Sequence, residues 1–283
     1  MGAYVPGTLI GPAFGSEFLL AKTEIVAEEI QQEEDNYVAA LEWGEANGAD
    51  VVNSSLGYLD WYSYCDMDGN TAITTIGIDI AASLGLTCVT SAGNWANQDP
   101  PEDPCETLSY YISAPADADS VIAVGAVSAD SLLAYFSSKG PSYDGRIKPE
   151  VCALGVGVAA ANPAGGYSVF YNGTSASSPL VAGAAAVLLS ANPQWTNMEI
   201  REALMMTASQ ADIPNNDYGY GLVNIWSALF YDYSGSTITT QQPASFSLHT
   251  AYPNPFNPTV TLAVSVTRSV SYTHLTLPTI LLV

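Results

Sequence analysis

The sequence predicts an α/β fold in which helices cover both faces of a parallel sheet. Two observations carry this prediction: short apolar runs with strand character recur along residues 1–231, and segments with helical periodicity separate them. Helices between strands imply parallel pairing, because the chain must cross back over the sheet before the next strand starts. With 283 residues and 48% hydrophobic residues, the chain can enclose a core of the size that such a sheet needs.

Each element is predicted from its own run of residues. Apolar runs predict strands at residues 18–22, 49–54, 88–91 and 121–127. Helical periodicity predicts helices at residues 71–84 and at residues 36–47, where Gly48 supplies the stop. A further helix is expected from Ser175 toward Leu189, and a late one runs to about Thr207 from the capping box of Thr196 and Glu199.

The charge balance excludes two classes of partner. The chain has 6 Lys and Arg residues against 28 Asp and Glu residues, which gives a formal net charge of −22. Nucleic acids and anionic membrane surfaces are themselves negative, so we expect the chain to bind neither. Such acidity fits a protein kept soluble outside the cell, although an acidic cytosolic protein from a salty habitat would have a similar composition.

The sequence shows no transmembrane segment and no signal segment. Its longest apolar run, residues 181–189, is too short to span a bilayer. No charged and then apolar segment of the kind that directs export opens the chain. Two expectations are left: the protein stays inside the cell, or its beginning is missing.

The four cysteines do not form a zinc motif, because none of them has the C-x-x-C spacing. Cys88 and Cys152 lie in strand-like runs and are expected to be buried thiols. Cys65 and Cys105 fall in loops, where free thiols are favoured over a bridge between them.

The candidate site comes from three short motifs. In an open parallel sheet, chemistry gathers at the carboxyl ends of the strands, so the residues directly after each strand matter most. Residues 53–57 read Asn-Ser-Ser-Leu-Gly, residues 91–94 read Ser-Ala-Gly-Asn, and residues 173–175 read Gly-Thr-Ser. The last motif places a hydroxyl at the start of an Ala-rich apolar helix, as an exposed nucleophile requires.

Together with further motifs, these segments resemble the subtilisin-like serine proteases. The further motifs are residues 136–141, 144–151 and 218–224, so the resemblance covers nearly all of residues 10–230. It implies a three-layer subtilisin-like sheet, incomplete at its N-terminus, over a peptidase domain at residues 1–231. It also implies the hydrolysis of peptide bonds in protein or peptide substrates.

The resemblance assigns roles to the candidate residues. Ser175 would be the nucleophile that forms the acyl-enzyme, with its own N–H and the Asn94 side-chain amide as oxyanion donors. The residues assigned to substrate binding are Ser55, Leu56, Gly57, Ser91, Ala92, Gly93 and Thr174. Simpler alternatives are a helix N-cap for Ser175, a left-handed turn residue for Asn94 and a turn hydroxyl for Thr174.

The base of the catalytic triad is missing from its expected place. The family orders its triad Asp, His and Ser, but the two histidines, His249 and His274, both follow Ser175. We therefore expect the chain to be inactive as written. We interpret Met1 as an internal methionine of a longer protein, whose Asp motif, His motif and signal peptide precede it. The alternative is a natural relative without a triad, which binds peptides or has a structural role.

No cofactor and no metal ligand set is predicted. Residues 66–70 resemble the start of a calcium loop, but Gly77 stands where the full pattern has a glutamate. A turn that caps the next helix explains these residues as well. A structural calcium ion is therefore left open.

The last fifty residues differ in composition from the rest. Residues 232–248 are rich in Tyr, Ser, Thr and Gln, which is typical of a linker. Residues 251–262 resemble the opening of the C-terminal sorting domains of the type IX secretion system, which are small β-sandwiches. Residues 249–268 are thus expected to be the start of such a domain, and residues 269–283, which resemble a translated sequencing adapter, a non-native tail. The motif implies the type IX secretion machinery as a partner and a secreted or cell-surface location.

Overall fold

The computed structural model describes residues 1–232, except for 98, 104, 106–109 and 163, together with three short strands at residues 246–248, 264–266 and 280–282. The chain divides into two compact units, one of residues 1–229 with 277–283 and one of residues 230–276. In the second unit, β10 (Phe246–Leu248) pairs antiparallel with β11 (Val264–Val266). The rest of the predicted linker beyond residue 232 and of the predicted sorting domain lies outside the described residues.

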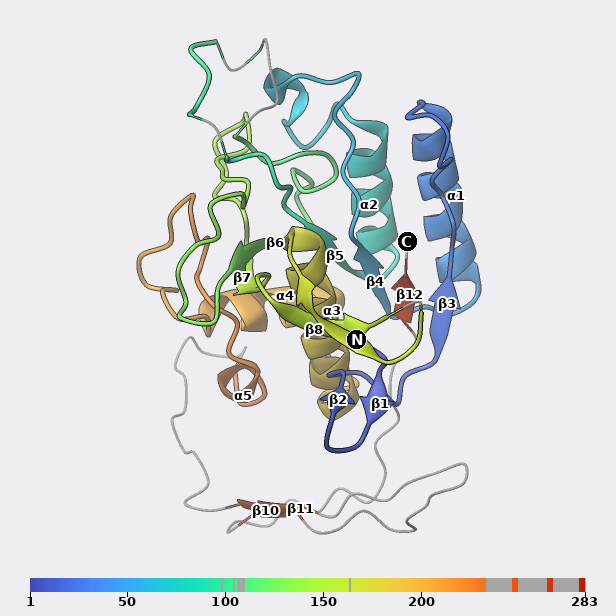
Figure 1. Cartoon of the computed structure of the whole chain (residues 1–283), viewed down its shortest axis with the longest axis vertical. Helices are drawn as coiled ribbons and strands as arrows, with labels where there is room; N and C mark the ends of the chain where they lie inside the picture. Colours follow the sequence, from blue (N-terminus) through green and yellow to red (C-terminus); the bar gives the residue numbers. More distant parts are fainter. Residues whose placement is uncertain are drawn as a thin grey trace. The chain divides into compact units, whose positions relative to one another are not determined.

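The first unit is built on a six-stranded sheet (Figure 1). The strands, in spatial order, are β3 (Phe18–Leu20), β12 (Ile280–Leu282), β4 (Val51–Ser54), β5 (Thr87–Ser91), β6 (Ile122–Val127) and β7 (Val151–Leu154). Every neighbouring pair in this sheet is parallel, which confirms the predicted class. All residues of β4, β5 and β6 are buried, as expected of central strands covered on both faces.

Helices lie on both faces of this sheet (Figure 1). On one face α1 (Gln32–Ala46) packs against α2 (Ile73–Ser83), and their side chains share a hydrophobic core with Val52 and Cys88. On the other face, α3 (Thr174–Ala191) crosses β4 to β7 and contacts α4 (Asn197–Met206). The core therefore forms two layers, one above and one below the strands.

The smaller elements are two hairpins and two short helices. They are the hairpin of β1 (Tyr4–Val5) and β2 (Leu9–Ile10), the hairpin of β8 (Val158–Ala161) and β9 (Tyr167–Tyr171), the 3-10 helix η1 (Tyr64–Asp66) and α5 (Ile225–Ala228). The β8–β9 hairpin ends two residues before Gly173, so it leads the chain directly into the start of α3.

The predicted elements are present, and the largest shift concerns α1. This helix begins at Gln32, four residues before the predicted start at residue 36, because an acidic first turn extends it. Glu33 accepts hydrogen bonds from the backbone N–H groups of Ile25 (2.6 Å) and Ile30 (3.3 Å) and so fixes the incoming loop. The late helix has the predicted capping box, with the Thr196 hydroxyl accepting from the Glu199 N–H at 3.2 Å.

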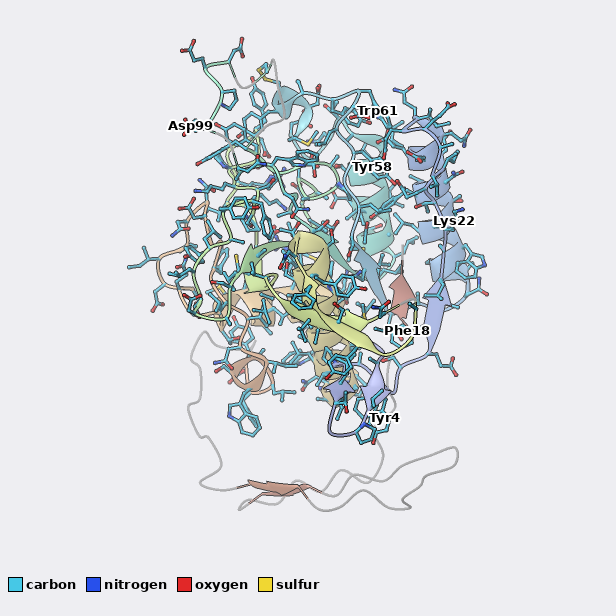
Figure 2. All side chains as sticks on the ribbon, viewed as in Figure 1. Tyr4, Phe18, Lys22, Tyr58, Trp61 and Asp99 are labelled. Carbon is cyan, nitrogen blue, oxygen red and sulfur yellow. A yellow bond between two sulfur atoms is a disulfide. The ribbon has the colours of Figure 1, made fainter. Side chains whose placement is uncertain are left out.

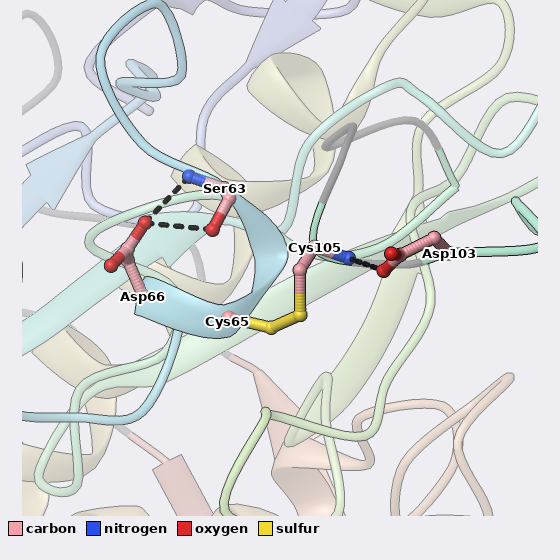
Figure 3. Close-up of a disulfide and its surroundings, with 5 residues drawn as sticks. All are labelled: Ser63, Cys65, Asp66, Asp103 and Cys105. Carbon is pink, nitrogen blue, oxygen red and sulfur yellow. Dashed lines mark hydrogen bonds between the residues drawn. A yellow bond between two sulfur atoms is a disulfide. The ribbon is translucent and has the colours of Figure 1, made fainter.

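The cysteines differ from expectation at one pair. Cys65 and Cys105 form a disulfide, although free thiols were favoured for them, and the bond joins the η1 region to the loop after β5 (Figure 3). Local sequence cannot show this contact, because forty positions separate the two residues. Cys88 and Cys152 are free and buried, as expected, and burial raises the pKa of both thiols to about 12.

By length and composition alone, α3 could cross a membrane. Its 18 residues include the apolar run 181–189, and 56% of that stretch is buried inside the domain. Its contacts with β4 to β7 identify it as the central helix of the α/β core.

Candidate active site

Ser175 lies in the first turn of α3, immediately after the sharp turn at Gly173. Gly173 is the N-cap of the helix and has a φ of +136°, a conformation that is essentially restricted to glycine. The N-cap alternative for Ser175 is therefore wrong, since the helix already contains this residue. Ser175 is exposed, and its Oγ makes no hydrogen bond with another described residue. The Ala176 N–H donates to the Gly173 carbonyl oxygen at 3.0 Å, whereas no such bond to a described residue is made by the Ser175 N–H, which lies at the positive end of the helix dipole.

Asn94 follows β5 and lies against the start of α3. Its Oδ1 accepts two hydrogen bonds from Thr174, one from the backbone N–H at 2.8 Å and one from the hydroxyl at 3.1 Å. An amide whose oxygen is fixed in this way keeps both Nδ2 protons available for another acceptor. The turn-residue alternative for Asn94 is wrong, because the left-handed residue of this turn is Gly93, with a φ of +111°.

The two predicted oxyanion donors approach one small space beside Gly173. A methyl group added at Gly173 would lie 3.6 Å from the backbone N of Ser175, 3.7 Å from Nδ2 of Asn94 and 3.6 Å from Oδ1 of Asn94, the oxygen that Thr174 engages. Two N–H donors that reach the same small space can stabilise an oxygen that carries developing negative charge.

Thr174 holds this arrangement together. It is completely buried, and its hydroxyl lies 3.2 Å from both the N and the O of Gly93, in addition to its contact with Asn94. The hydroxyl accepts from the Gly93 N–H and has one proton to share between the two oxygens. Thr174 thus links the end of β5 to the start of α3, and its predicted contact with substrate stays a prediction.

The end of β4 is tied to the same turn. The hydroxyl of Ser55 donates to the carbonyl oxygen of Ser175 at 3.0 Å. One turn further along α3, the buried Ser178 hydroxyl donates to Oδ1 of Asn53 at 2.8 Å. The strand that carries one predicted pocket wall is therefore fixed to the helix that carries Ser175.

The two predicted pocket walls, residues 55–57 and 91–93, lie side by side. Ser91 Oγ donates to the carbonyl oxygen of Leu56 at 3.3 Å, which joins them directly. A methyl group added at Gly57 would lie 2.5 Å from Ser113 Oγ, and one added at Gly93 would lie 3.2 Å from the same atom. Because Gly57 and Gly93 have no side chain, Ser113 can pack closely against both walls. Ala92, between Ser91 and Gly93, is fully buried, so its side chain belongs to the core.

Ser113 is a residue of this region that sequence reasoning missed. It is 1% exposed, and its hydroxyl has no hydrogen-bond partner among the described residues. A buried hydroxyl without a partner is costly and is uncommon in folded proteins. Residues 110–114 carry no motif, so only the contacts with Gly57 and Gly93 place Ser113 between the walls.

The described part of the chain offers no histidine as a base for Ser175. Residues 1–232 contain no histidine, and His249 and His274 lie outside the described residues. The described residues thus include the predicted nucleophile and the two predicted donors but no imidazole to accept a proton.

Two acidic groups were considered as metal ligands. In the predicted calcium loop, Asp66 accepts from the N–H and hydroxyl of Ser63 (Figure 3). Asp68 accepts from two backbone N–H groups, which fits the turn alternative. Carboxylate oxygens of Glu24, Glu29 and Glu33 lie within 4.8 Å of one another. Tyr58 donates to Glu24, and backbone N–H groups donate to Glu33, so protein donors already bind two of the three carboxylates.

The comparison with known proteins agrees with this geometry. The sequence matches the profile of the subtilase family over residues 7–221, which include the end of β4, Asn94 and Ser175. This chain belongs to the subtilase family. The family is one of serine endopeptidases. The matched segment contains every residue that was assigned to the candidate site.

Individual subtilases show the same relationship. The chain is 38% identical over 192 residues to subtilisin amylosacchariticus from Bacillus subtilis subsp. amylosacchariticus, an alignment that covers 68% of this chain and 44% of that protein. It is 38% identical over 191 residues to a subtilisin from Bacillus pumilus, covering 68% and 60%. This subtilase chain thus spans about half the length of the curated relatives that it matches.

Solved structures confirm the fold. The prenylagaramide maturation protease PagA superimposes with a TM-score of 0.58 at 22% identity, covering 77% of this chain and 87% of that one. MycP1 with its N-terminal propeptide removed superimposes with a TM-score of 0.56 at 21% identity, covering 75% and 71%. At these identities the likeness concerns the subtilisin-like α/β fold.

Proposed function

We propose that this chain is the nucleophile-bearing part of a secreted serine endopeptidase. One observation carries the proposal: Ser175 N and Asn94 Nδ2 lie 3.6 and 3.7 Å from the same point beside Gly173, while the Asn94 oxygen is already engaged by the N–H and the hydroxyl of Thr174. A merely structural turn would not require the amide protons of Asn94 to remain free.

In the proposed reaction, Ser175 Oγ attacks the carbonyl carbon of the substrate peptide bond, and a base accepts its proton. The carbonyl oxygen becomes an oxyanion, which accepts hydrogen bonds from Ser175 N and Asn94 Nδ2. The bond from carbon to nitrogen then breaks, the proton passes to the leaving amine, and water later hydrolyses the ester on Ser175. Removing an oxyanion-hole side chain of this kind costs about 10²–10³ in turnover, a magnitude for which subtilisin itself is the worked example.

The proposed substrate pocket lies between residues 55–57 and 91–93. Apart from Leu56, both walls consist of small residues, so a peptide can lie close to the backbone. The unpartnered Ser113 hydroxyl lies against Gly57 and Gly93. The pocket would therefore accept a substrate residue of modest size.

We also propose that the 283-residue chain does not hydrolyse peptides by itself, because neither histidine precedes Ser175 and no described residue bonds to its Oγ. Loss of the base of a triad lowers turnover by about 10⁶. The test compares the purified chain with its Ser175→Ala variant on a fluorogenic peptide and expects equal rates. Turnover within about a hundredfold of an ordinary enzyme's 10 per second, abolished by Ser175→Ala, would refute inactivity.

The alternative function is a peptide-binding or structural module without a triad. The observation that favours it is the same lack of a histidine ahead of Ser175. A fluorophosphonate probe separates the two proposals in a form of the protein extended upstream in the same reading frame. Covalent labelling at Ser175, lost in Ser175→Ala, supports the peptidase. Peptide binding with no labelling supports the binding module.

Export is supported by three features. The Cys65–Cys105 disulfide is typical of oxidising compartments, the net charge is −22, and residues 251–262 carry the motif that resembles a type IX sorting domain. We propose secretion or surface attachment through that machinery, with a signal peptide encoded upstream. Fusing residues 232–268 and their natural continuation to a periplasmic reporter tests this proposal, and a reporter that stays in the periplasm of a type IX host would oppose it.

A further inference from the structure

Four hydroxyl groups in the core of the first unit have no hydrogen-bond partner among the described residues. They belong to Tyr37 of α1, Ser54 of β4, Thr74 of α2 and Thr90 of β5, and each of these residues is 0% exposed. A buried hydroxyl without a partner is costly, and such groups are rare in folded proteins. Four of them on neighbouring elements therefore indicate a partner that they share.

Ser54 and Thr90 lie side by side on the sheet. They are paired residues of the parallel strands β4 and β5, and neighbouring strands lie about 4.8 Å apart. Side chains alternate between the two faces of a strand, so Ser54 shares its face with Val52, and Thr90 shares its face with Cys88. Val52 and Cys88 belong to the core that α1 and α2 cover. The hydroxyls of Ser54 and Thr90 therefore lie between the sheet and these two helices.

Thr74 faces Thr90 from α2. This helix connects the parallel strands β4 and β5, so it runs antiparallel to them. Cys88 Sγ lies 3.9 Å from the carbonyl oxygen of Ile78, which places Ile78 over Cys88. Thr74 precedes Ile78 by four residues, a rise of about 6 Å in a helix, and Thr90 follows Cys88 by two residues, about 6.6 Å along a strand. The two displacements have the same direction and nearly the same length, so they bring Thr74 over Thr90.

Tyr37 completes the group from α1. Burial raises the pKa of the Tyr37 hydroxyl, and the Ser54 hydroxyl beside it partly opposes this shift. The two oxygens nevertheless make no hydrogen bond of acceptable geometry with each other. The Tyr37 ring packs edge-on against the ring of Tyr58, which is labelled in Figure 2, with 5.8 Å between the ring centroids. This contact fixes the ring, so the Tyr37 hydroxyl stays beside Ser54.

We propose that the hydroxyls of Tyr37, Ser54, Thr74 and Thr90 bind a buried water molecule between the sheet and the layer of α1 and α2. Buried waters typically make about three hydrogen bonds, and they make them to polar groups that the protein leaves unpaired. A hydroxyl can rotate to donate or to accept, so the four groups can share one water molecule. None of the four side chains is charged at neutral pH, which favours water over an ion.

The proposed water site lies beneath both predicted pocket walls. Ser54 directly precedes the wall at residues 55–57, and Thr90 directly precedes the wall at residues 91–93. A water molecule shared by Ser54 and Thr90 joins the bases of the two walls, in addition to the direct hydrogen bond from Ser91 to Leu56. The inference concerns the support of this region, and it does not depend on whether the chain is a peptidase.

A high-resolution crystal structure of the intact 283-residue chain is the first test. An isolated peak of electron density should lie about 2.5–3.0 Å from at least three of the four hydroxyl oxygens, those of Tyr37 and Thr90 among them. Hydroxyls that instead bond to one another or to backbone carbonyl oxygens, with no peak between them, would overturn the proposal.

The second test measures stability in solution by urea denaturation. Tyr37→Phe and Thr90→Val each remove one hydroxyl and keep the shape of the side chain. If the hydroxyl bonds to water in the folded protein, its loss should raise the equilibrium constant for unfolding about two- to tenfold. Removing a hydroxyl that has no partner at all leaves this constant unchanged or lowers it. An unchanged or lowered constant in either variant would therefore refute the water site.

The double variant separates one shared water molecule from two separate partners. If both hydroxyls bind the same molecule, the double variant should raise the unfolding constant at least about twofold less than the product of the two single effects. A simple product of the single effects would show separate partners and overturn the shared site. Tyr167→Phe is the matched control: Tyr167 is 52% exposed, so this variant should stay within about twofold of the original chain. Neither experiment measures peptidase activity, so a failure here leaves the proposed function untouched.

Discussion

Asn94 and Thr174 are held together by two hydrogen bonds that converge on a single oxygen. The N–H and the hydroxyl of Thr174 both donate to Oδ1 of Asn94, at 2.8 and 3.1 Å. This contact orients the amide and joins the end of β5 to the start of α3. The nucleophile turn and the proposed oxyanion donor therefore form one local unit, and their separation is set by Thr174.

Replacing Thr174 by valine tests this unit. Valine keeps the shape but removes the hydroxyl, which leaves the buried backbone N–H and C=O of Gly93 and the side-chain oxygen of Asn94 with fewer partners. We expect the free energy of unfolding to fall by about 1–3 kcal/mol, measured by urea denaturation. The side-chain amide NMR signal of Asn94 should also shift.

Thr174→Ser is the matched control, because it keeps the hydroxyl and loses only a methyl group. It should retain the Asn94 signal. A valine variant as stable as the original chain, with an unchanged Asn94 signal, would show that the hydroxyl does not orient the amide.

Gly173→Ala tests the space between the two donors. Alanine at a φ of +136° is strained, and its methyl group would lie 3.6 Å from Ser175 N. We expect a loss of about 1–3 kcal/mol in unfolding free energy from the backbone strain. In an active, extended form of the protein, turnover should fall as well because the methyl group occupies the donors' common space.

Gly7→Ala is the control for the strain alone, since Gly7 has a φ of +76° and nothing lies within 4 Å of an added methyl group. It should lower stability without changing turnover in the extended protein. A Gly173→Ala variant with full turnover would argue against the proposed position of the oxyanion.

The disulfide should stabilise the loops on one side of the sheet. Cys65 and Cys105 close a loop of about forty residues, for which chain entropy predicts a contribution near 4 kcal/mol as an upper figure. We expect the Cys65→Ser, Cys105→Ser double variant to lose about 2–4 kcal/mol in urea denaturation.

Thiol titration provides the control for this prediction. Because burial raises the pKa of Cys88 and Cys152 to about 12, neither should react with a thiol reagent in the folded protein. Reaction should appear after mild reduction, at Cys65 and Cys105. Immediate reaction of those two residues in unreduced protein would show that the bond does not form.

The sequence predicts the centre of the fold better than its edges. β4, β5, β6 and α2 lie within two residues of their predicted bounds, because buried parallel strands are continuous apolar runs between turns. The start of α1 was missed, although its first turn carries Glu33, Glu34 and Asp35, and acidic residues favour a helix N-terminus. Glu34 is nonetheless fully buried, since the Nε1 of Trp61 and the hydroxyl of Tyr62 donate to it from the loop after β4. Figure 2 shows Trp61 beside Tyr58 in that loop.

The sequence predicted which motifs belong to the candidate site, but it did not predict the contacts between them. Motif order suggested that Asn94 and Ser175 meet, and the structure brings them together, although their chemical roles stay proposals. Three features had no local signal: the pairing of β12 with β3 and β4, the Cys65–Cys105 bond, and Ser113 between the two predicted walls. Each joins residues far apart in the sequence, and such contacts depend on the packing of the whole domain.

Asp117 should make the stability of the domain fall as pH rises from mildly acidic values. The side chain is fully buried, and desolvation raises its pKa above the ordinary value, although hydrogen bonds from Thr75 and Gly69 and the charge of Lys148 partly oppose this. The folded state therefore binds the Asp117 proton more tightly than the unfolded state does. As pH rises from about 4, the unfolded chain ionises first, so this group favours unfolding increasingly until the folded pKa is passed.

Asp117→Asn removes this pH dependence, while any fixed cost of the substitution is the same at every pH. The unfolding free energy of the variant minus that of the original chain should therefore rise between about pH 4 and pH 7.

Asp144→Asn is a control with the opposite sign. Desolvation raises the pKa of Asp144, but hydrogen bonds from Arg146 and Ser142 outweigh it and leave the pKa below its ordinary value. Ionised Asp144 thus stabilises the folded state at pH values above the carboxyl pKa of the unfolded chain. The Asp144→Asn variant should therefore lose stability relative to the original chain as pH rises. Parallel curves for Asp117→Asn and the original chain would show that Asp117 titrates alike in both states.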